Sequence, residues 1–315
     1  MFEDLRSFFK NPQNALSRQE PISGGPSNAK RSIIAVVNQK GGVGKTTTCI
    51  NLAAGLAKRG LKVLIIDLDP QSNASLGLGV DTDHYSTSIY DVLVHNADLD
   101  QAIVQTYQKN LEIAPASSML TGAQLEIADL LGRERLLRTA IYKMLATSSR
   151  NYDYILLDCS PSLNLLTING LATAKHVLVP MQTHYFSLEG MKELFSTLKV
   201  VKDRINPELE VLGILPAIVD VKRKHSQEMI GQLREYFKEK MLTTMIRMNT
   251  VLAEAAAHGR SIFDHSPNSN GAKDYAQLVD EVVALTQAPA NGVWRVESAL
   301  SVRSPLGPES PAAVN

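Results

Sequence analysis

Short runs of β-branched and other apolar residues alternate with amphipathic stretches along the chain from residue 32 onward. Each apolar run is nearly continuous, which is typical of strands that are covered on both faces of a sheet. The runs are SIIAVVN, KVLIIDLD, YDYILLD, HVLVPM and EVLGILPAI, and helices are predicted between them, among others over 46–59, 124–146, 188–204 and 226–240. This alternation predicts an α/β fold with a doubly wound, mostly parallel sheet flanked by helices. In such a sheet, the residues that carry chemistry are expected at the carboxyl ends of strands.

The two ends of the chain differ in composition from the middle. Residues 1–30 are rich in Pro, Ser, Asn and Gly and have no sustained period, so they are interpreted as a flexible leader. The first ten residues place three phenylalanines and a leucine at helical spacing, and a short helix that docks on a partner or a membrane is the alternative there. Residues 286–315 combine prolines with small residues and are expected to form a disordered tail, in which Trp294 has no assigned role. One large domain is therefore predicted over 31–285.

Charge and cysteine content narrow the classes of protein to consider. The 315 residues carry 32 basic and 32 acidic side chains, so any binding to nucleic acid must come from a local basic patch. The chain has no apolar run long enough to cross a bilayer and no secretion signal, so a cytoplasmic protein is expected. Cys49 and Cys159 both fall in core-like segments and are interpreted as small buried side chains, not as a disulfide.

The strongest chemical signal is the segment NQKGGVGKTTT at 38–48, which follows the first predicted strand and precedes the first predicted helix. Its glycines let backbone N–H groups close around phosphate oxygens, and the helix N-terminus adds its positive dipole. Lys45 is expected to reach the terminal phosphates, and the Thr46 hydroxyl to complete the shell of a Mg²⁺ ion. A Gly-rich turn or a dinucleotide-binding loop would need neither residue. The predicted nucleotide contacts are Lys40, Gly41, Gly42, Val43, Gly44, Lys45, Thr46 and Thr47.

The loop departs from the usual phosphate-binding pattern at its first position, where Gln39 replaces a glycine and Lys40 follows. In this form, KGGVGKTT resembles the deviant Walker A motif of the ParA and MinD family. The resemblance implies a P-loop ATPase that uses ATP and Mg²⁺, in which Lys40 contacts the nucleotide of a second subunit across a dimer interface. A cation delivered in this way would neutralise charge on the transferring phosphoryl group. Hydrolysis would then require an ATP-bound homodimer.

Two later segments match the same family in order and kind. The strand VLIIDLDPQ ends in two acids, and the resemblance assigns Asp69 to orienting the attacking water and Asp67 to the magnesium shell. A simple capping role is the alternative for Asp67. The strand YDYILLDCSP ends in Asp158, which would hold the metal through water as a Walker B acid does. The predicted catalytic residues are Lys40, Lys45 and Asp69, and the predicted metal-binding residues are Thr46, Asp67 and Asp158.

The resemblance extends over about 31–285, where later matches such as PMQT at 180–183 are interpreted as packing and dimer surfaces. It also implies non-specific binding to double-stranded DNA through basic residues near the C-terminal third. The segment DVKRKH at 220–225 is predicted to open a helix, and Lys222 falls where relatives carry a DNA-binding arginine. Val251 stands where they carry a second one, so that contact is missing, and Lys199, Lys202, Arg247 and Arg260 are either replacements for it or ordinary solvated charges. The tentative DNA contacts are Lys222, Arg223, Lys224 and Arg247.

The function that fits these features best is an ATPase that dimerises with ATP, binds the DNA of the nucleoid and partitions or positions a cargo. A ParB-like or cargo-adaptor protein would stimulate its weak hydrolysis. A MinD-like, membrane-associated spatial regulator is the alternative, but residues 286–315 lack the basic amphipathic helix that it needs. An iron–sulfur reductase would need exposed cysteines, and a sequence-specific repressor would need a longer leader. The cargo is left open among a plasmid, a chromosome and a protein complex.

Overall fold

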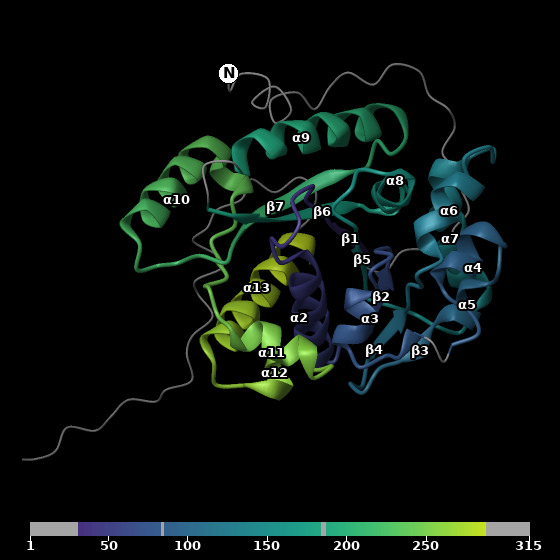
Figure 1. Cartoon of the computed structure of the whole chain (residues 1–315), viewed down its shortest axis with the longest axis horizontal. Coiled ribbons are helices and arrows are strands. Elements are labelled where there is room, and N and C mark those ends of the chain that lie inside the picture. The colour runs from purple at the N-terminus through teal and green to yellow at the C-terminus, as the bar shows by residue number, and fades with distance from the viewer. Residues whose placement is uncertain (1–30, 83–84, 184–186, 288–315) are drawn as a thin grey trace, which may run out of the picture.

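A seven-stranded sheet forms the centre of the molecule in a computed structural model. The structure describes residues 31–82, 85–183 and 187–287, and at 187–190 it describes only the backbone. The strand order is β3-β4-β2-β5-β1-β6-β7, and every neighbouring pair is parallel except β3 and β4. Figure 1 shows helices on both faces of this sheet. The predicted α/β fold with a doubly wound, mostly parallel sheet is therefore confirmed.

Five of the strands are those predicted from the apolar runs. Their bounds are β1 Ser32–Val36, β2 Val63–Asp67, β5 Tyr154–Asp158, β6 His176–Gln182 and β7 Glu210–Ala217. The short strands β3 Val104–Gln105 and β4 Leu111–Ala114 were not predicted. The apolar run of β4 is interrupted by Glu112, which accepts a hydrogen bond from the Tyr152 hydroxyl at 2.6 Å. The place of β4 in the sheet comes from its parallel pairing with β2, which a single sequence pattern does not reveal.

The described helices divide between the two faces of the sheet. Their bounds are α2 Lys45–Lys58, α3 Asn73–Gly77, α4 Ile89–Val94, α5 Leu99–Ala102, α6 Leu120–Glu126, α7 Leu136–Thr147, α8 Leu165–Thr173, α9 Ser187–Arg204, α10 Lys224–Phe237, α11 Val251–Ala257, α12 Ile262–His265 and α13 Asn270–Gln287, with short 3₁₀ turns η2 Arg133–Arg135 and η3 Lys238–Lys240. In β1, Ile33 and Ala35 pack into the core layer that helices α4 to α10 complete. Ile34 and Val36 pack into the opposite layer, with α2, α3 and α11 to α13. Alternate side chains are therefore buried on both faces, as the continuous apolar runs predict.

The predicted single helix over 124–146 is wrong. Helix α6 ends at Glu126, a turn follows, and α7 begins only at Leu136. Gly132 lies in this turn with a φ of 73°, a left-handed conformation that interrupts a helix. Apolar residues continue at helical spacing across the turn, so periodicity alone does not show the break.

The predicted helix over 226–240 is confirmed with shifted ends. It begins at Lys224 and ends at Phe237, because Lys238 has a φ of 48° and a short 3₁₀ turn follows. In the part of the chain that the structure describes, no helix is both long and apolar enough to cross a membrane. The predicted leader and the Trp294 segment lie outside the described residues, and α13 continues to Gln287.

Candidate nucleotide-binding site

The glycine-rich loop joins the carboxyl end of β1 to the N-terminus of α2, at the edge where the parallel strands end (Figure 1). Gly42 and Gly44 have φ values of 69° and 87°, which residues with a Cβ atom adopt only at a cost in free energy. A Cβ atom added to Gly41, Gly42 or Gly44 would meet no heavy atom within 4 Å, so the loop borders open space. The backbone N–H groups of the loop can therefore be approached closely by a phosphate group.

The two lysines of the loop have different environments. Lys45 is only 7% exposed, and its Nζ donates a hydrogen bond to the Lys40 carbonyl at 3.2 Å. Burial lowers the pKa of Lys45, while Asp158 and Asp69 nearby act in the opposite direction. The Lys40 side chain is exposed, and its ammonium has no hydrogen bond or ion pair with any residue that the structure describes. Lys45 thus belongs to the loop of its own chain, whereas Lys40 is available to a second molecule.

The remaining predicted nucleotide contacts lie at the start of α2. Val43 is buried, and Thr46 and Thr47 are partly exposed in the first turn of the helix. This turn contains no acidic residue, so no carboxylate within it competes with a phosphate for the positive end of the helix dipole.

Asp67 and Asp158 end the adjacent strands β2 and β5 and are direct partners in the register of the sheet. Both are fully buried, and Asp69 is 7% exposed. Burial and the neighbouring carboxylate of Asp67 are the main causes that raise the pKa of Asp158 well above its usual range; Asp69 adds to them, and Thr46 and Lys45 act in the opposite direction. Neither Asp158 oxygen accepts a hydrogen bond of regular geometry from the described residues. Buried carboxylates in this state favour a nearby cation.

Asp67, in contrast, accepts several hydrogen bonds. Its Oδ1 accepts from the Asp69 backbone at 3.2 Å, and its Oδ2 accepts from the backbone and hydroxyl of Ser75 at 3.0 and 2.7 Å. Burial nevertheless raises the pKa of Asp67 to about 6. These bonds fix the turn that carries Asp69, whose own Oδ1 accepts from the Gln71 backbone at 3.0 Å. The geometry supports the alternative that Asp67 organises this turn, and its predicted place in the magnesium shell stays a prediction.

The chemistry of Asp158 and Thr46 fits a magnesium ion. Mg²⁺ is usually held by one or two protein oxygens, while waters and phosphate oxygens fill its other positions. Asp158 offers two buried oxygens that lack hydrogen-bond partners of normal geometry among the described residues. The Thr46 side chain, in the first turn of α2, is near enough to lower the pKa of Asp158. Among the described residues, no three His, Cys, Asp or Glu side chains are arranged to hold a metal by themselves. Asp158 and Thr46 would therefore hold the ion jointly with a nucleotide.

Two residues to which the sequence analysis did not assign a role in holding the loop, Asn38 and Gln182, hold it against β6; Gln182 belongs to the segment interpreted there as a packing or dimer surface. The Asn38 side chain donates to the Pro180 carbonyl at 2.7 Å and accepts from the Lys40 backbone at 3.0 Å. The Gln182 side chain donates to the Gly42 carbonyl at 2.9 Å. The available signal was their position at the carboxyl ends of two apolar runs, where functional side chains are expected.

Cys49 and Cys159 are both buried and free, which confirms their predicted role as small core side chains. Burial raises the pKa of both thiols, and the nearby Asp158 adds to the effect. Both cysteines are therefore poor nucleophiles and poor metal ligands.

The predicted DNA contacts at 222–224 lie on the surface where α10 begins. All three side chains are exposed, and two of them, Arg223 and Lys224, form ion pairs with nearby acidic side chains. Arg223 Nε lies 3.1 Å from the Asp220 carboxylate, and Lys224 Nζ lies 3.9 Å from that of Glu228. Because exposed ion pairs of this kind contribute little free energy, the three cations remain able to contact phosphate groups.

Arg247, the fourth predicted DNA contact, is in a different environment. Its backbone pairs with Val219, which places it beside the basic segment at 222–224. Its guanidinium binds Asp274 with Nη2–Oδ1 and Nε–Oδ2 distances of 2.5 and 3.0 Å, and its backbone N–H donates to the same carboxylate at 3.0 Å. Asp274 is buried, so this ion pair compensates an interior charge. Arg247 is therefore engaged within its own domain.

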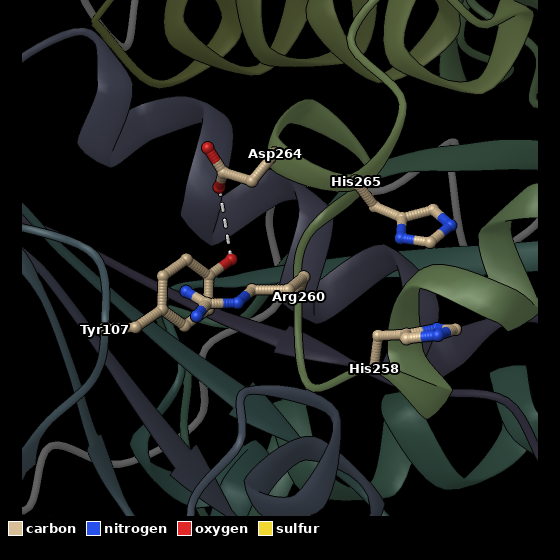
Figure 2. A pocket seen from close by; sticks show the side chains of 5 residues that line it. All are labelled: Tyr107, His258, Arg260, Asp264 and His265. Atoms are coloured by element: carbon tan, nitrogen blue, oxygen red, sulfur yellow. Dashed lines mark hydrogen bonds between the residues drawn. The ribbon is translucent and has the colours of Figure 1, made fainter.

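A hollow of about 520 Å³ lies near the C-terminal end of α2, where Lys58 pairs with Asp264, whereas the glycine-rich loop precedes the N-terminal end of this helix. Figure 2 shows the side chains that line the hollow. Tyr107, His258, Arg260, Asp264 and His265 line it. The Arg260 guanidinium lies 4.1 Å from the centre of the Tyr107 ring, and Lys58 binds Asp264 at 2.6 Å. Arg260, a candidate to replace the missing DNA contact, is thus stacked on Tyr107 within its own domain.

Comparison with known proteins finds relatives that match most of this chain. Residues 31–211 match the family model described as an AAA domain. The chain is 42% identical over 252 residues to the sporulation initiation inhibitor protein Soj of Bacillus subtilis, covering 80% of this chain and 98% of Soj. It is 39% identical over 251 residues to the chromosome partitioning protein ParA of Myxococcus xanthus, covering 80% of this chain and 87% of that protein.

A solved structure shows the same fold with nucleotide bound. The septum site-determining protein MinD of Pyrococcus horikoshii, complexed with Mg-ADP, has a TM-score of 0.66 and 26% identity to this chain, and the match covers 82% of this chain and 98% of MinD. The fold agrees with this structure, and ATP and Mg²⁺ are the cofactors. The chain therefore belongs to the ParA and MinD family of P-loop ATPases.

Proposed function

We propose that this ATPase forms a homodimer when it binds ATP, holds double-stranded DNA without sequence preference in that state, and partitions or positions a cargo. The observation that carries the proposal is the contrast between the two loop lysines: Lys45 is buried in the loop, and Lys40 is exposed without a partner among the described residues. A cation with no role in its own subunit suits the nucleotide of a second subunit, where it would stabilise charge on the transferred phosphoryl group. The names of Soj and ParA, a sporulation inhibitor and a chromosome partitioning protein, support this class of function.

The residues around the loop have distinct roles in this proposal. Lys45 and the backbone of the loop bind the phosphates, while Asp158 and Thr46 hold Mg²⁺. Asp69 is held at the end of β2 by the turn that Asp67 organises, and it orients the attacking water. Hydrolysis remains slow until dimerisation adds Lys40, and a partner protein stimulates it further.

The decisive experiment compares the two lysine variants. Lys45→Ala is expected to abolish nucleotide binding, because the phosphates lose the cation of their own loop. Lys40→Ala is expected to bind a fluorescent ATP analogue as the parent does, but to hydrolyse ATP on the order of a hundredfold more slowly. A Lys40→Ala variant that hydrolyses ATP at the parent rate would refute the contact between subunits.

Removal of the water-orienting acid gives a second test of the dimer. Asp69→Ala is expected to bind ATP and remain a dimer, because hydrolysis no longer returns it to the ADP state. Light scattering measures the mass of the complex with ATP and Mg²⁺. A mass that corresponds to the monomer under these conditions would contradict the proposed cycle.

DNA binding is assigned to residues 222–224. Two such basic segments in a dimer would act together on one duplex, so affinity is expected to require ATP and to fall steeply with salt. Reversal of Lys222, Arg223 and Lys224 to Glu is expected to abolish the mobility shift of a duplex of arbitrary sequence, while ATP-dependent dimerisation remains. An unchanged shift would remove this segment from the DNA surface. Imaging of the tagged protein tests the proposed association with the nucleoid.

A further inference from the structure

Four large apolar side chains are exposed within a short stretch around helix α6. Met119 is 57% exposed, Leu125 79%, Leu130 43% and Leu131 102%. Single exposed apolar residues are ordinary on protein surfaces, but several close together mark a contact with another molecule. These four residues are called the α6 patch below.

The α6 patch lies at the same edge of the sheet as the nucleotide site. Strand β4 is parallel to β2, and the chain enters the patch directly from its carboxyl end. On this path, the Ala116 backbone donates to Ser75 Oγ at 3.3 Å, and Ser75 Oγ donates to Asp67. After the patch, the Arg133 carbonyl accepts from Asn169 of α8 at 2.7 Å, and α8 follows closely after Asp158. Figure 1 shows α6 and the N-terminal end of α2 at this edge.

The charges around the α6 patch favour a second copy of this chain as its occupant. The neighbouring residues include both acids and bases, Glu126, Asp129, Arg133, Glu134 and Arg135. A surface with both signs can complement itself across a two-fold axis, where the same patch meets its copy. DNA and an anionic membrane would instead require a predominantly basic rim.

We infer that the α6 patch is buried against the second subunit when this chain dimerises with ATP. The inference rests on the proposed function, because it requires two subunits that meet at their nucleotide edges. In the single subunit, Leu131 is fully exposed and therefore has the largest area to bury. The apolar contact supplies affinity for the dimer, while Lys40 supplies the contact to the nucleotide.

The first test measures the exposure of Leu131 in solution. The full chain with Leu131→Cys reacts with a maleimide, while the buried Cys49 and Cys159 contribute little background. With a non-hydrolysable ATP analogue and Mg²⁺, labelling is expected to slow at least about tenfold, as burial in an interface core excludes the reagent. Val200→Cys is the matched control, since Val200 is 51% exposed on α9. Equal labelling rates with and without the analogue, in a sample that light scattering shows to be dimeric, would overturn the inference.

Slow labelling of Leu131→Cys in the nucleotide-free monomer would also overturn the inference, because another part of the chain would then cover the patch.

The second test replaces two of the exposed leucines at once, in the double variant Leu125→Ser and Leu131→Ser. Its dimer with the analogue is expected to dissociate at a protein concentration at least about tenfold higher than that of the parent. Binding of the analogue to the monomer stays unchanged, and Val200→Ser behaves as the parent.

The outcomes separate the inference from the function on which it rests. If the parent stays monomeric with the analogue, the proposed dimer fails and the inference fails with it. If the parent dimerises and the double leucine variant dimerises equally well, only the inference fails. A double variant that dimerises normally but is no longer stimulated by its partner protein would assign the patch to that partner, against the inference.

Discussion

Replacing Asp158 with asparagine is expected to stabilise the protein in the absence of nucleotide and Mg²⁺. Asp158 is fully buried, its two oxygens lack regular hydrogen-bond partners among the described residues, and Asp67 and Asp69 add like charge. A buried polar group without partners costs about 1–3 kcal/mol, and more when it is charged. Asparagine keeps the shape and removes the charge, so a gain of roughly 1–3 kcal/mol is expected. For a domain of this size, that gain corresponds to roughly 2–10 °C in Tm.

Thermal unfolding of parent and variant in EDTA measures this gain. Because the pKa of Asp158 is raised in the folded state, the folded parent binds this proton more tightly than the unfolded chain. The stability that this tighter proton binding contributes is fully present below about pH 3.9, the pKa of the Asp158 carboxyl in the unfolded chain. It is lost as the pH rises through the pKa of Asp158 in the folded protein. The advantage of Asp158→Asn should therefore grow between acidic and neutral pH. Asp67, whose pKa is raised to about 6, is present in both proteins and lowers the stability of both as the pH rises.

Mg²⁺ with an ATP analogue should reverse the order, because only the parent has the carboxylate to hold the ion. Glu208→Gln, which removes an exposed acid outside the nucleotide site and the α6 patch, is the control and should leave both measurements unchanged within about 0.5 kcal/mol. An Asp158→Asn variant that is less stable than the parent in EDTA at neutral pH would refute the reasoning. An equal gain of both proteins from Mg²⁺ and the analogue would refute the metal-binding role.

Three further substitutions test contacts of the domain. Arg247→Met should lower the free energy of unfolding in urea by about 1–3 kcal/mol, because the buried Asp274 loses its cation and the partial exposure of the guanidinium limits the loss. If Arg247 instead contacted DNA, the substitution would lower the affinity for DNA, measured by fluorescence anisotropy, and leave the stability unchanged. Gln182→Ala should weaken ATP binding about three- to tenfold in a nucleotide titration, because the Gly42 carbonyl loses its bond, and unchanged affinity would contradict this. Gly55→Ala places a Cβ atom 2.5 Å from Val279 and should lower the free energy of unfolding by about 1–3 kcal/mol, and an unchanged Tm would contradict this.

The glycine-rich loop could be predicted because its information is local. The glycines, Lys45 and Thr46 follow one another between a strand and a helix, and the chemistry of a phosphate site depends on that order alone. The strands β1, β2, β5, β6 and β7 were predicted for a similar reason, since burial on both faces leaves continuous apolar runs. Strand β4 and the break between α6 and α7 left no such local pattern, and both were missed.

The sequence by itself determined the fold class, the phosphate-binding loop and the acids at the ends of two strands, because strand burial and loop chemistry are short-range properties of the chain. Only the tertiary structure decided how these residues are used. The pairing of β2 with β5 places Asp67 opposite Asp158. Asp67 accepts hydrogen bonds from Ser75, whereas Asp158 has no hydrogen-bond partner of normal geometry among the described residues. Such roles depend on contacts between residues distant in sequence, which packing sets and no local pattern records.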